Sequence, residues 1–434
     1  MTRAWLAAAV VAAACLVSPA VVDASTAHAS QPKASQAPGS PPWVGTWAAS
    51  PEEGTASSSV CPAGSGGFEN KTVRNIVYTS VGGDEVRVRL SNTFGTAPLT
   101  IGSASVALDE IQASTVPGSM RRLRFGGSTS VTIPAGSEVL SDPVRLRVHA
   151  QQDLAVSAYV PSMTGPATYH QVAMQTSWVS GDGDHATSGT STDYPQPINC
   201  WMFADGVEVP GSAHVTGSVI AFGDSITDGN QSDNDANARW PNVLARRLDA
   251  VAGPTMSVVD EGISGNMLLT DQVGSQGQSG LHRLGRDVIG QPGAKAVIML
   301  LGTNDIRYTD VGQDSPPATA ASIINGYKQV IARVHAAGLR IIGATITPFL
   351  TLPVPASGWQ DAAGEAMREK VNHWILTSHA FDGIVDFSSA VASPYDHRTL
   401  NPVYDSGDYL HPDDAGYQVM GDRVPLSLLL GDNR

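Results

Sequence analysis

The sequence predicts two folded parts: an all-β sandwich of jelly-roll type, and after it an α/β domain with helices on both faces of a parallel sheet. Three observations support this. The 434 residues exceed what one hydrophobic core usually organises. Single apolar residues alternate with polar ones in the first part of the chain, and apolar runs alternate with helical patterns in the second. The change of period falls near residue 205.

The N-terminal segment resembles an export signal. Residues 1–29 combine Arg3, an apolar stretch over 6–17 and the small-residue site Ala27-His28-Ala29, as secretory signal peptides do. The apolar stretch is too short to span a membrane. Residues 30–42 are rich in Pro, Ser, Ala and Gln without periodicity, which predicts a disordered linker. We therefore expect an extracellular protein.

The number of cysteines is consistent with an exported protein. Removal of the signal takes Cys15 with it; a lipid-attachment site at Cys15 is the alternative, although three alanines precede this residue inside the apolar stretch. Cys61 and Cys200 then remain, and in an exported protein two cysteines most simply form one disulfide. Two free buried thiols are the other possibility. A bridge would join the first and last parts of the β domain.

Residues 43–205 show the two-residue period of strands with one buried face. Val86, Val88 and Leu90 alternate with charged residues, and the segments 144–148 and 154–160 follow the same rule. Gly-rich turn signals separate these segments, and no amphipathic helix is visible. The pattern favours a β-sandwich.

Residues 215–434 alternate between apolar strands and helical stretches, which predicts a parallel sheet covered on both faces. Residues 322–337 place their apolar side chains on one helical face. A fragment beginning near Val215 would be expected to contain the whole of this α/β part. The strand candidates are residues 219–222, 256–259, 296–301, 340–346 and 384–387.

The net charge and the absence of several sequence motifs disfavour certain partners and certain classes of enzyme. The formal net charge of −14 disfavours nucleic acid or an anionic membrane surface as partner, and we expect a monomer without stable membrane insertion. The sequence has no His-Glu-x-x-His, Walker loop or Cys-x-x-Cys, so neither a metal nor a cofactor is expected. It also lacks the Gly-x-Ser-x-Gly elbow of α/β-hydrolases.

Ser225 is the candidate nucleophile. It follows the apolar run 219–222 and lies in the turn Gly-Asp-Ser-Ile-Thr-Asp-Gly. The carboxyl end of a strand opens into the crevice where open α/β folds bind ligands, and a tight turn can expose a hydroxyl there. Ser and Asp between glycines are also ordinary turn residues, so the rest of the chain must supply matching groups.

Later segments supply those groups. His411, three residues after Asp408, can act as the base that accepts the serine proton, and Asp408 can orient its imidazole. Gly265 and Asn304 each follow an apolar run and offer N–H donors for an oxyanion, with the backbone N–H of Ser225 as a third. A turn glycine, a helix-capping asparagine and a turn aspartate are the alternative roles.

The order Ser225, Gly265, Asn304, Asp408 and His411, each in its local motif, resembles the SGNH hydrolases, also called the GDSL lipase and esterase family. The resemblance covers about residues 215–432, and Gly-Asp-Ser-Ile replaces the usual Gly-Asp-Ser-Leu. It implies a three-layer α/β/α hydrolase domain and a metal-free serine esterase using these residues. Some secreted bacterial members carry an N-terminal β-sandwich.

Four loop residues suggest the kind of ester that is cleaved. Met267, Phe349 and Trp359 lie in apolar loops that could line an acyl or aromatic pocket or pack on neighbouring loops, and Tyr395 opens a polar, aromatic run suited to a sugar or phenolic ring. We expect removal of acetyl or feruloyl groups from plant cell-wall polysaccharides. Lipid or phospholipid acyl hydrolysis is the alternative. A carbohydrate-binding protein with a vestigial hydrolase domain is the alternative from another class.

Overall fold

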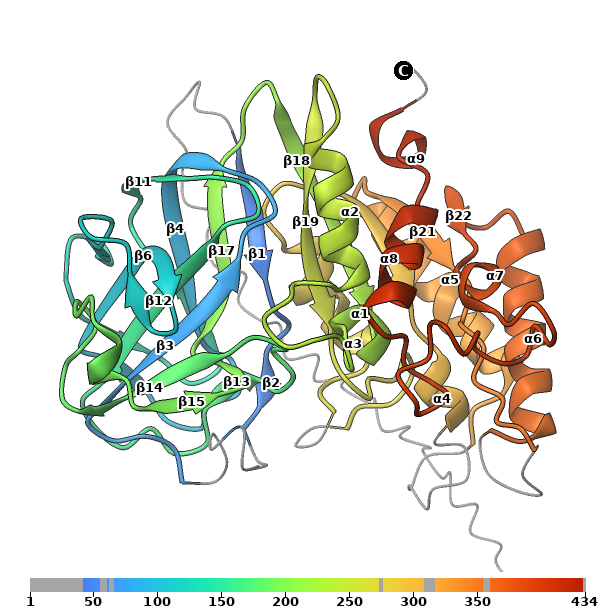
Figure 1. Cartoon of the computed structure of the whole chain (residues 1–434), viewed down its shortest axis with the longest axis horizontal. Helices are drawn as coiled ribbons and strands as arrows, with labels where there is room; N and C mark the ends of the chain where they lie inside the picture. Colours follow the sequence, from blue (N-terminus) through green and yellow to red (C-terminus); the bar gives the residue numbers. More distant parts are fainter. Residues whose placement is uncertain are drawn as a thin grey trace, which may run out of the picture. The chain divides into compact units, whose positions relative to one another are not determined.

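The computed structural model describes residues 42–54, 61, 66–272, 276–307, 317–353 and 360–431 (Figure 1). The predicted signal peptide (1–29) and nearly all of the predicted linker (30–42) lie outside these residues. The domain boundaries at 43–205 and 215–434 stay predictions, because residues 41–434 cluster as one compact unit.

The first part of the described chain is an all-β region of antiparallel strands, as the two-residue period predicts. One sheet has the order β1-β17-β4-β10, with β11 also paired to β4, and a second has the order β15-β14-β3-β12-β6-β7, with β8 paired to β6. Smaller sheets are β16-β13-β2 and β5-β9. The bounds are β1 (Trp43–Ala48), β2 (Glu52–Glu53), β3 (Lys71–Tyr78), β4 (Gly83–Asn92), β5 (Leu99–Ile101), β6 (Ser103–Ile111), β7 (Ser114–Thr115), β8 (Arg121–Arg122), β9 (Val131–Ile133), β10 (Ser137–Leu140), β11 (Val144–Val148), β12 (Asp153–Val160), β13 (Thr168–His170), β14 (Ser177–Asp182), β15 (Gln196–Ile198), β16 (Trp201–Met202) and β17 (Ala204–Pro210), with one short 3₁₀ turn, η1 (Ser191–Asp193).

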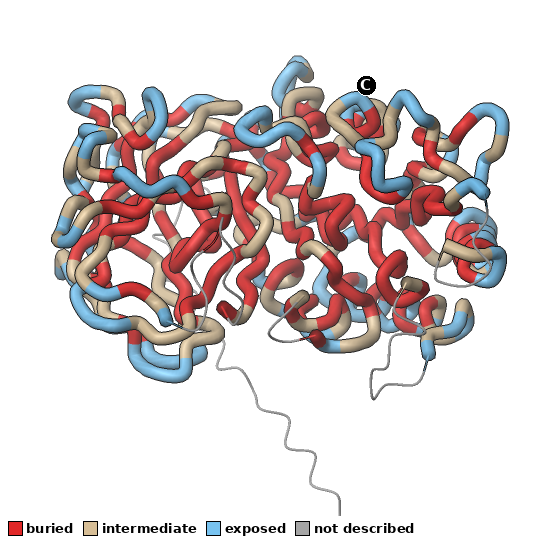
Figure 2. Tube along the Cα trace, turned by 60° about the horizontal axis from the view of Figure 1, so that its bottom comes forward, coloured by how far each residue is buried: buried red, intermediate tan, exposed pale blue. Residues whose placement is uncertain are grey.

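The two larger sheets share one hydrophobic core. Val86, Val88 and Leu90 of β4 are fully buried in it, as their alternation predicts. The opposite face of β4 is not freely exposed either: Arg87 forms an ion pair with Glu208 of β17, and both side chains are largely buried. Figure 2 shows that buried residues run through both the β region and the α/β region.

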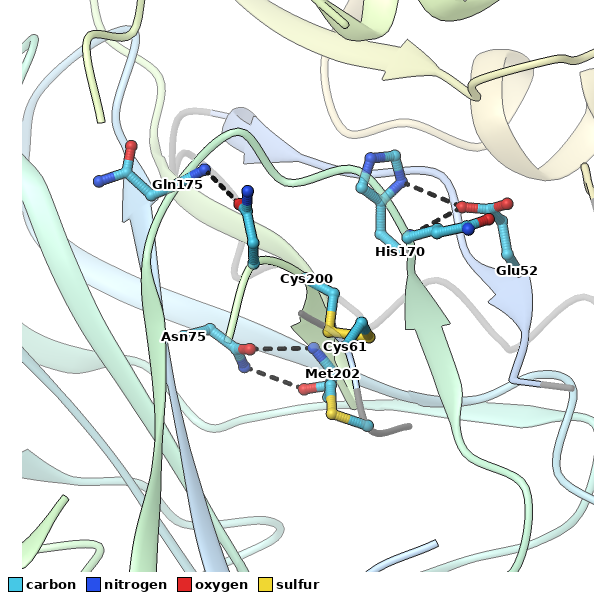
Figure 3. Close-up of a disulfide and its surroundings, with 9 residues drawn as sticks. Glu52, Cys61, Asn75, His170, Gln175, Cys200 and Met202 are labelled. Carbon is cyan, nitrogen blue, oxygen red and sulfur yellow. Dashed lines mark hydrogen bonds and ion pairs between the residues drawn. A yellow bond between two sulfur atoms is a disulfide. The ribbon is translucent and has the colours of Figure 1, made fainter. Parts of the chain in front are cut away.

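The predicted disulfide is present in the structure. Cys61 and Cys200 are bonded, which joins the segment before β3 to the residue before β16 (Figure 3). Beside the bridge, the Asn75 side chain donates to the carbonyl of Met202 and accepts from its N–H, both at 2.9 Å. These bonds fix β16 against β3 in the β region.

The second part of the chain is an α/β region with five parallel strands in the order β19-β18-β20-β21-β22. All five predicted strands are present, with ends that differ by at most four residues. The strands are β18 (Val215–Gly223), β19 (Thr255–Gly262), β20 (Ala294–Leu300), β21 (Arg340–Ala344) and β22 (Gly383–Val385). The helices are α1 (Ser225–Asp228), α2 (Trp240–Asp249), α3 (Gly280–Leu284), the π-turn η2 (Gly285–Ile289), α4 (Thr303–Arg307), α5 (Ala320–Ala336), α6 (Ala362–Thr377), α7 (Phe387–Val391), α8 (Asp414–Arg423) and α9 (Ser427–Leu430).

Helices cover both faces of this sheet, as expected for buried parallel strands. Figure 1 shows α2 and α8 in front of the sheet, where they contact each other, while α5 contacts α3 and α6. The predicted helix over 322–337 is α5, which begins with a capping box between Thr319 and Ser322. Within the described part of the chain, no helix is both long and apolar enough to cross a membrane.

The β region packs directly against the α/β region through β1 and β19. The Gly45 N–H donates to the carbonyl of Pro292 at 3.2 Å, and the Val258 N–H donates to Ser80 Oγ at 3.2 Å. Backbone groups of one region therefore find their hydrogen-bond partners in the other, so the two regions are structurally coupled.

A fully buried guanidinium, that of Arg283 on α3, lies where these elements meet. It stacks over the Phe222 ring at 4.3 Å from the ring centroid. Each acceptor comes from a different segment, so one side chain ties together the ends of β18 and β19 and the β region. The acceptors, at 2.8–3.1 Å, are Asn266 Oδ1, Gly223 O, Glu261 O, Ser50 Oγ and Asp287 Oδ2.

Replacing Arg283 with Met should lower the free energy of unfolding by about 3–5 kcal/mol, because the buried carbonyls of Gly223 and Glu261 lose their donor and Asp287, which keeps Arg286, loses a second counter-charge. Urea denaturation measures this loss. The matched control is Arg147→Ala, which breaks an exposed ion pair to Asp84 and should cost less than about 0.5 kcal/mol. Equal stability of Arg283→Met and wild type would show that the buried guanidinium does not hold the fold.

Candidate active site

Ser225 lies at the carboxyl end of β18, where it begins helix α1. The residue before it, Asp224, caps this helix by accepting from the Ile226 N–H at 3.1 Å. Strand β18 lies between β19 and β20 in the sheet. The strand that follows β18 in the sequence, β19, lies on one side of it, and the next strand, β20, lies on the other side. Open α/β sheets bind ligands outside the strand ends at such a switch point, and Ser225 lies at this one.

Asp408, His411 and Ser225 form one chain of hydrogen bonds. The distance from Ser225 Oγ to His411 Nε2 is 2.9 Å, and from His411 Nδ1 to Asp408 Oδ2 it is 2.5 Å. An ionised carboxylate only accepts, so Nδ1 carries a proton and Nε2 is free to accept the proton of the serine hydroxyl. This arrangement can activate a serine for attack.

The local backbone holds Asp408 in place. Its Oδ1 accepts from the N–H groups of Leu410 and His411, at 2.9 and 2.8 Å. Partial burial would raise the pKa of Asp408, but the hydrogen bonds from His411 outweigh it and hold the pKa well below its usual range. Asp408 is therefore an anion at neutral pH, as a group that stabilises an imidazolium must be.

Gly265 and Asn304 lie on adjoining segments at the same edge of the sheet. The Ile263 N–H donates to the carbonyl of Gly223, next to the serine turn, and Asn304 Nδ2 donates to the carbonyl of Asn266 at 3.1 Å. Gly265 has φ +79°, a conformation that strains other residues, and a Cβ there would meet the Gln276 side chain. The segment thus needs a glycine beside the Asn304 amide.

Asp305 is a further residue that sequence analysis did not single out. Its carboxylate accepts from the N–H groups of Leu268 and Leu269, at 2.8 and 3.0 Å, and so fixes the segment that follows Gly265. Burial raises its pKa to about 6. The only sequence signal was its position directly after Asn304.

The four residues predicted to bind substrate have different surroundings. Phe349 is fully buried in the core of the α/β region, which fits the packing alternative. Met267 is also buried, and its sulfur accepts from Gln272 Nε2. Tyr395 is 96% exposed, and Trp359 lies outside the described residues. In the described ranges, no group of three or more His, Cys, Asp or Glu could hold a metal ion.

Comparisons with known proteins identify a family model that matches the α/β region. Residues 221–419 match the model of the GDSL-like lipase/acylhydrolase family. None of the curated proteins compared with the chain matches it. Similar solved structures include the M. smegmatis aryl esterase, with 18% identity and a TM-score of 0.37 over 48% of this chain and 95% of that one. Another is Est24, a carbohydrate acetylesterase from Sinorhizobium meliloti, with 17% identity and a TM-score of 0.37 over 47% and 94%.

The matched span begins inside β18 and ends inside α8, so it covers the strand ends and loops described above. It contains all five residues that the sequence singled out. Residues 221–419 are therefore a GDSL-like lipase/acylhydrolase domain, and the protein is an ester hydrolase.

Proposed function

We propose that the protein is a secreted serine esterase that cleaves carboxylic esters through an acyl-enzyme on Ser225. The hydrogen-bond chain from Ser225 through His411 to Asp408 is the observation that carries this proposal. Secretion is supported by the Cys61–Cys200 disulfide, since such bridges persist in oxidising compartments.

In the acylation step, Ser225 Oγ bonds to the ester carbonyl carbon while its proton moves to His411 Nε2. Asp408 stabilises the imidazolium that forms. The tetrahedral intermediate then collapses, the bond to the alcohol oxygen breaks, and the alcohol leaves with the proton from Nε2. The acyl group remains on Ser225.

Deacylation repeats these steps with water in place of the serine. His411 Nε2 takes a proton from the water as its oxygen attacks the acyl carbon. The second intermediate collapses with return of that proton to Ser225 Oγ. The carboxylic acid leaves, and the resting hydrogen-bond chain forms again.

Both intermediates carry an oxyanion, and three donors can bind it: the N–H groups of Ser225 and Gly265 and the side-chain amide of Asn304. The Asn304 amide has two hydrogens, of which one is donated to the carbonyl of Asn266. We propose that the second is donated to the oxyanion.

We propose acetylated or feruloylated plant cell-wall polysaccharides as the substrates. Tyr395 is 96% exposed, and Tyr409 lies between Asp408 and His411 with 49% of its surface exposed. Tyr409 adjoins the catalytic Asp408, and Tyr395 lies on the same connection between α7 and α8, so these exposed rings offer flat apolar faces on which a sugar or phenolic ring can lie. Lipid acyl esters are the second candidate, since exposed Val403 adds apolar surface to the same loop.

Replacing Ser225 with Ala should lower turnover of p-nitrophenyl acetate at least about 1000-fold, because the nucleophile is lost. Ser427→Ala, at an exposed serine of α9, is the control and should leave turnover unchanged. If folded Ser225→Ala kept more than about one per cent of wild-type turnover, Ser225 would not be the nucleophile.

Asn304→Ala should lower kcat about 100- to 1000-fold with little change in KM, since its donor is needed mainly when charge develops on the oxygen. Steady-state kinetics on the same ester separate the two constants. Asn325→Ala, on the exposed face of α5, serves as control. An effect on KM alone would mean that Asn304 binds the ground-state substrate.

A panel of acetylated xylan, feruloylated xylan and long-chain acyl esters tests the substrate class. We expect the highest kcat/KM on the polysaccharide esters, and Tyr395→Ala should lower it there while sparing p-nitrophenyl acetate, which is too small to need the ring. A preference for long-chain acyl esters would favour the lipid candidate instead.

A further inference from the structure

We propose that His170 of the β region is a positioning residue for the ester hydrolase, because it holds Asp228, and through Asp228 holds Ser264, next to the oxyanion donor Gly265. This inference rests on the oxyanion role proposed for Gly265. It makes the β region part of the scaffold of the active site.

The link is a continuous chain of hydrogen bonds. His170 Nε2 lies 3.0 Å from Asp228 Oδ1, and Ser264 Oγ donates to Asp228 Oδ2 at 2.8 Å. The side chains of His170 and Asp228 are only 4% and 3% exposed. His170 ends β13, Asp228 ends α1, and Ser264 follows β19, so three separate elements meet at one carboxylate.

Backbone packing makes the link sensitive to position. Helix α1 lies so close to the end of β19 that a Cβ on Gly262 would come within 2.3 Å of the Asp228 nitrogen. The same short helix begins with Ser225, and the segment after β19 carries Ser264 and Gly265. A shift of Asp228 would therefore move the nucleophile and an oxyanion donor relative to each other.

The hydrogen-bond partners of His170 favour its positively charged form. Its Nδ1 lies 2.9 Å from the carbonyl of Ser50, which only accepts, and its Nε2 faces the Asp228 carboxylate. Both ring nitrogens are thus donors, which is the protonated imidazolium. The Glu52 carboxylate lies 3.8 Å from Nδ1, and Figure 3 shows the two side chains facing each other near the disulfide.

The charges around the pair support this state. Burial would lower the pKa of His170, but Asp228 and then Glu52 outweigh it and raise the pKa to about 9. Burial likewise would raise the pKa of Asp228, but His170 holds it below its usual value. Asp260 and Arg239 also act on this group of charges. Without His170, the Asp228 carboxylate would lose its nearest counter-charge.

The test compares His170→Leu with His170→Gln in the full chain. His170→Leu should lower kcat on p-nitrophenyl acetate about 10- to 100-fold, since small misplacement of reacting groups has effects of this size, while KM changes less than about twofold. His170→Gln keeps an N–H donor toward Asp228 and should restore most of the turnover.

Thr168→Val is the matched control. Thr168 is buried on the same strand and bonds only within the β region, where its hydroxyl accepts from the Phe94 N–H at 2.9 Å. We expect this variant to lose stability in urea but to keep the kcat of wild type. A loss of kcat in Thr168→Val equal to that in His170→Leu would overturn the inference, because any damage to β13 would then suffice.

Ser264→Ala keeps the test decisive if His170→Leu fails to fold. It leaves the His170–Asp228 pair intact and removes only the last link, so it should lower kcat at nearly constant KM. Unchanged kcat in folded Ser264→Ala or His170→Leu would overturn the positioning role. A wild-type protein without esterase activity would instead overturn the proposed function, so the two failures are distinguishable.

Discussion

The buried guanidinium of Arg283 holds the ends of β18 and β19 and the β region together. A charge in this position is tolerated only when every donor is satisfied, and its acceptors come from the ends of β18 and β19, the segment after Gly265, and Ser50 of the β region. If the strand ends that carry the reactive groups moved apart, the guanidinium would keep Asp287 as its counter-charge but would lose the carbonyl acceptors of Gly223 and Glu261.

The active site follows from that arrangement. Hydrogen bonds from Ile263 to the serine turn and from Asn304 to Asn266 join the ends of the three strands β18, β19 and β20, and Asp305 fixes the segment that follows Gly265. The serine hydroxyl and the oxyanion donors are then held before substrate arrives, which lowers the reorganisation needed during reaction. The β region contributes through Ser50 and His170, so catalysis and domain packing share the same contacts.

The parallel strands and the hydrogen-bonded site residues could be predicted from the sequence, but the contacts between distant segments could not. Apolar runs located all five parallel strands, and short motifs identified the residues that form the hydrogen-bond chain at Ser225. Local patterns do not report contacts between distant segments, so Arg283 and His170 gave no signal. The apolar loop residue Phe349 could have lined a pocket or packed inside, and only the tertiary structure shows that it is buried. For the same reason the sequence suggested an independent fragment from Val215, which would lack His170.

The proposed mechanism requires a covalent acyl-enzyme on Ser225. Rapid quenching of the full chain with p-nitrophenyl acetate, followed by mass spectrometry of its peptides, would detect this intermediate. We expect a transient acetyl group on the peptide that contains Ser225, with formation and decay that match a burst of p-nitrophenol. Turnover without an acetylated Ser225 peptide, or kinetically competent acetylation at another residue, would show that Ser225 is not the nucleophile.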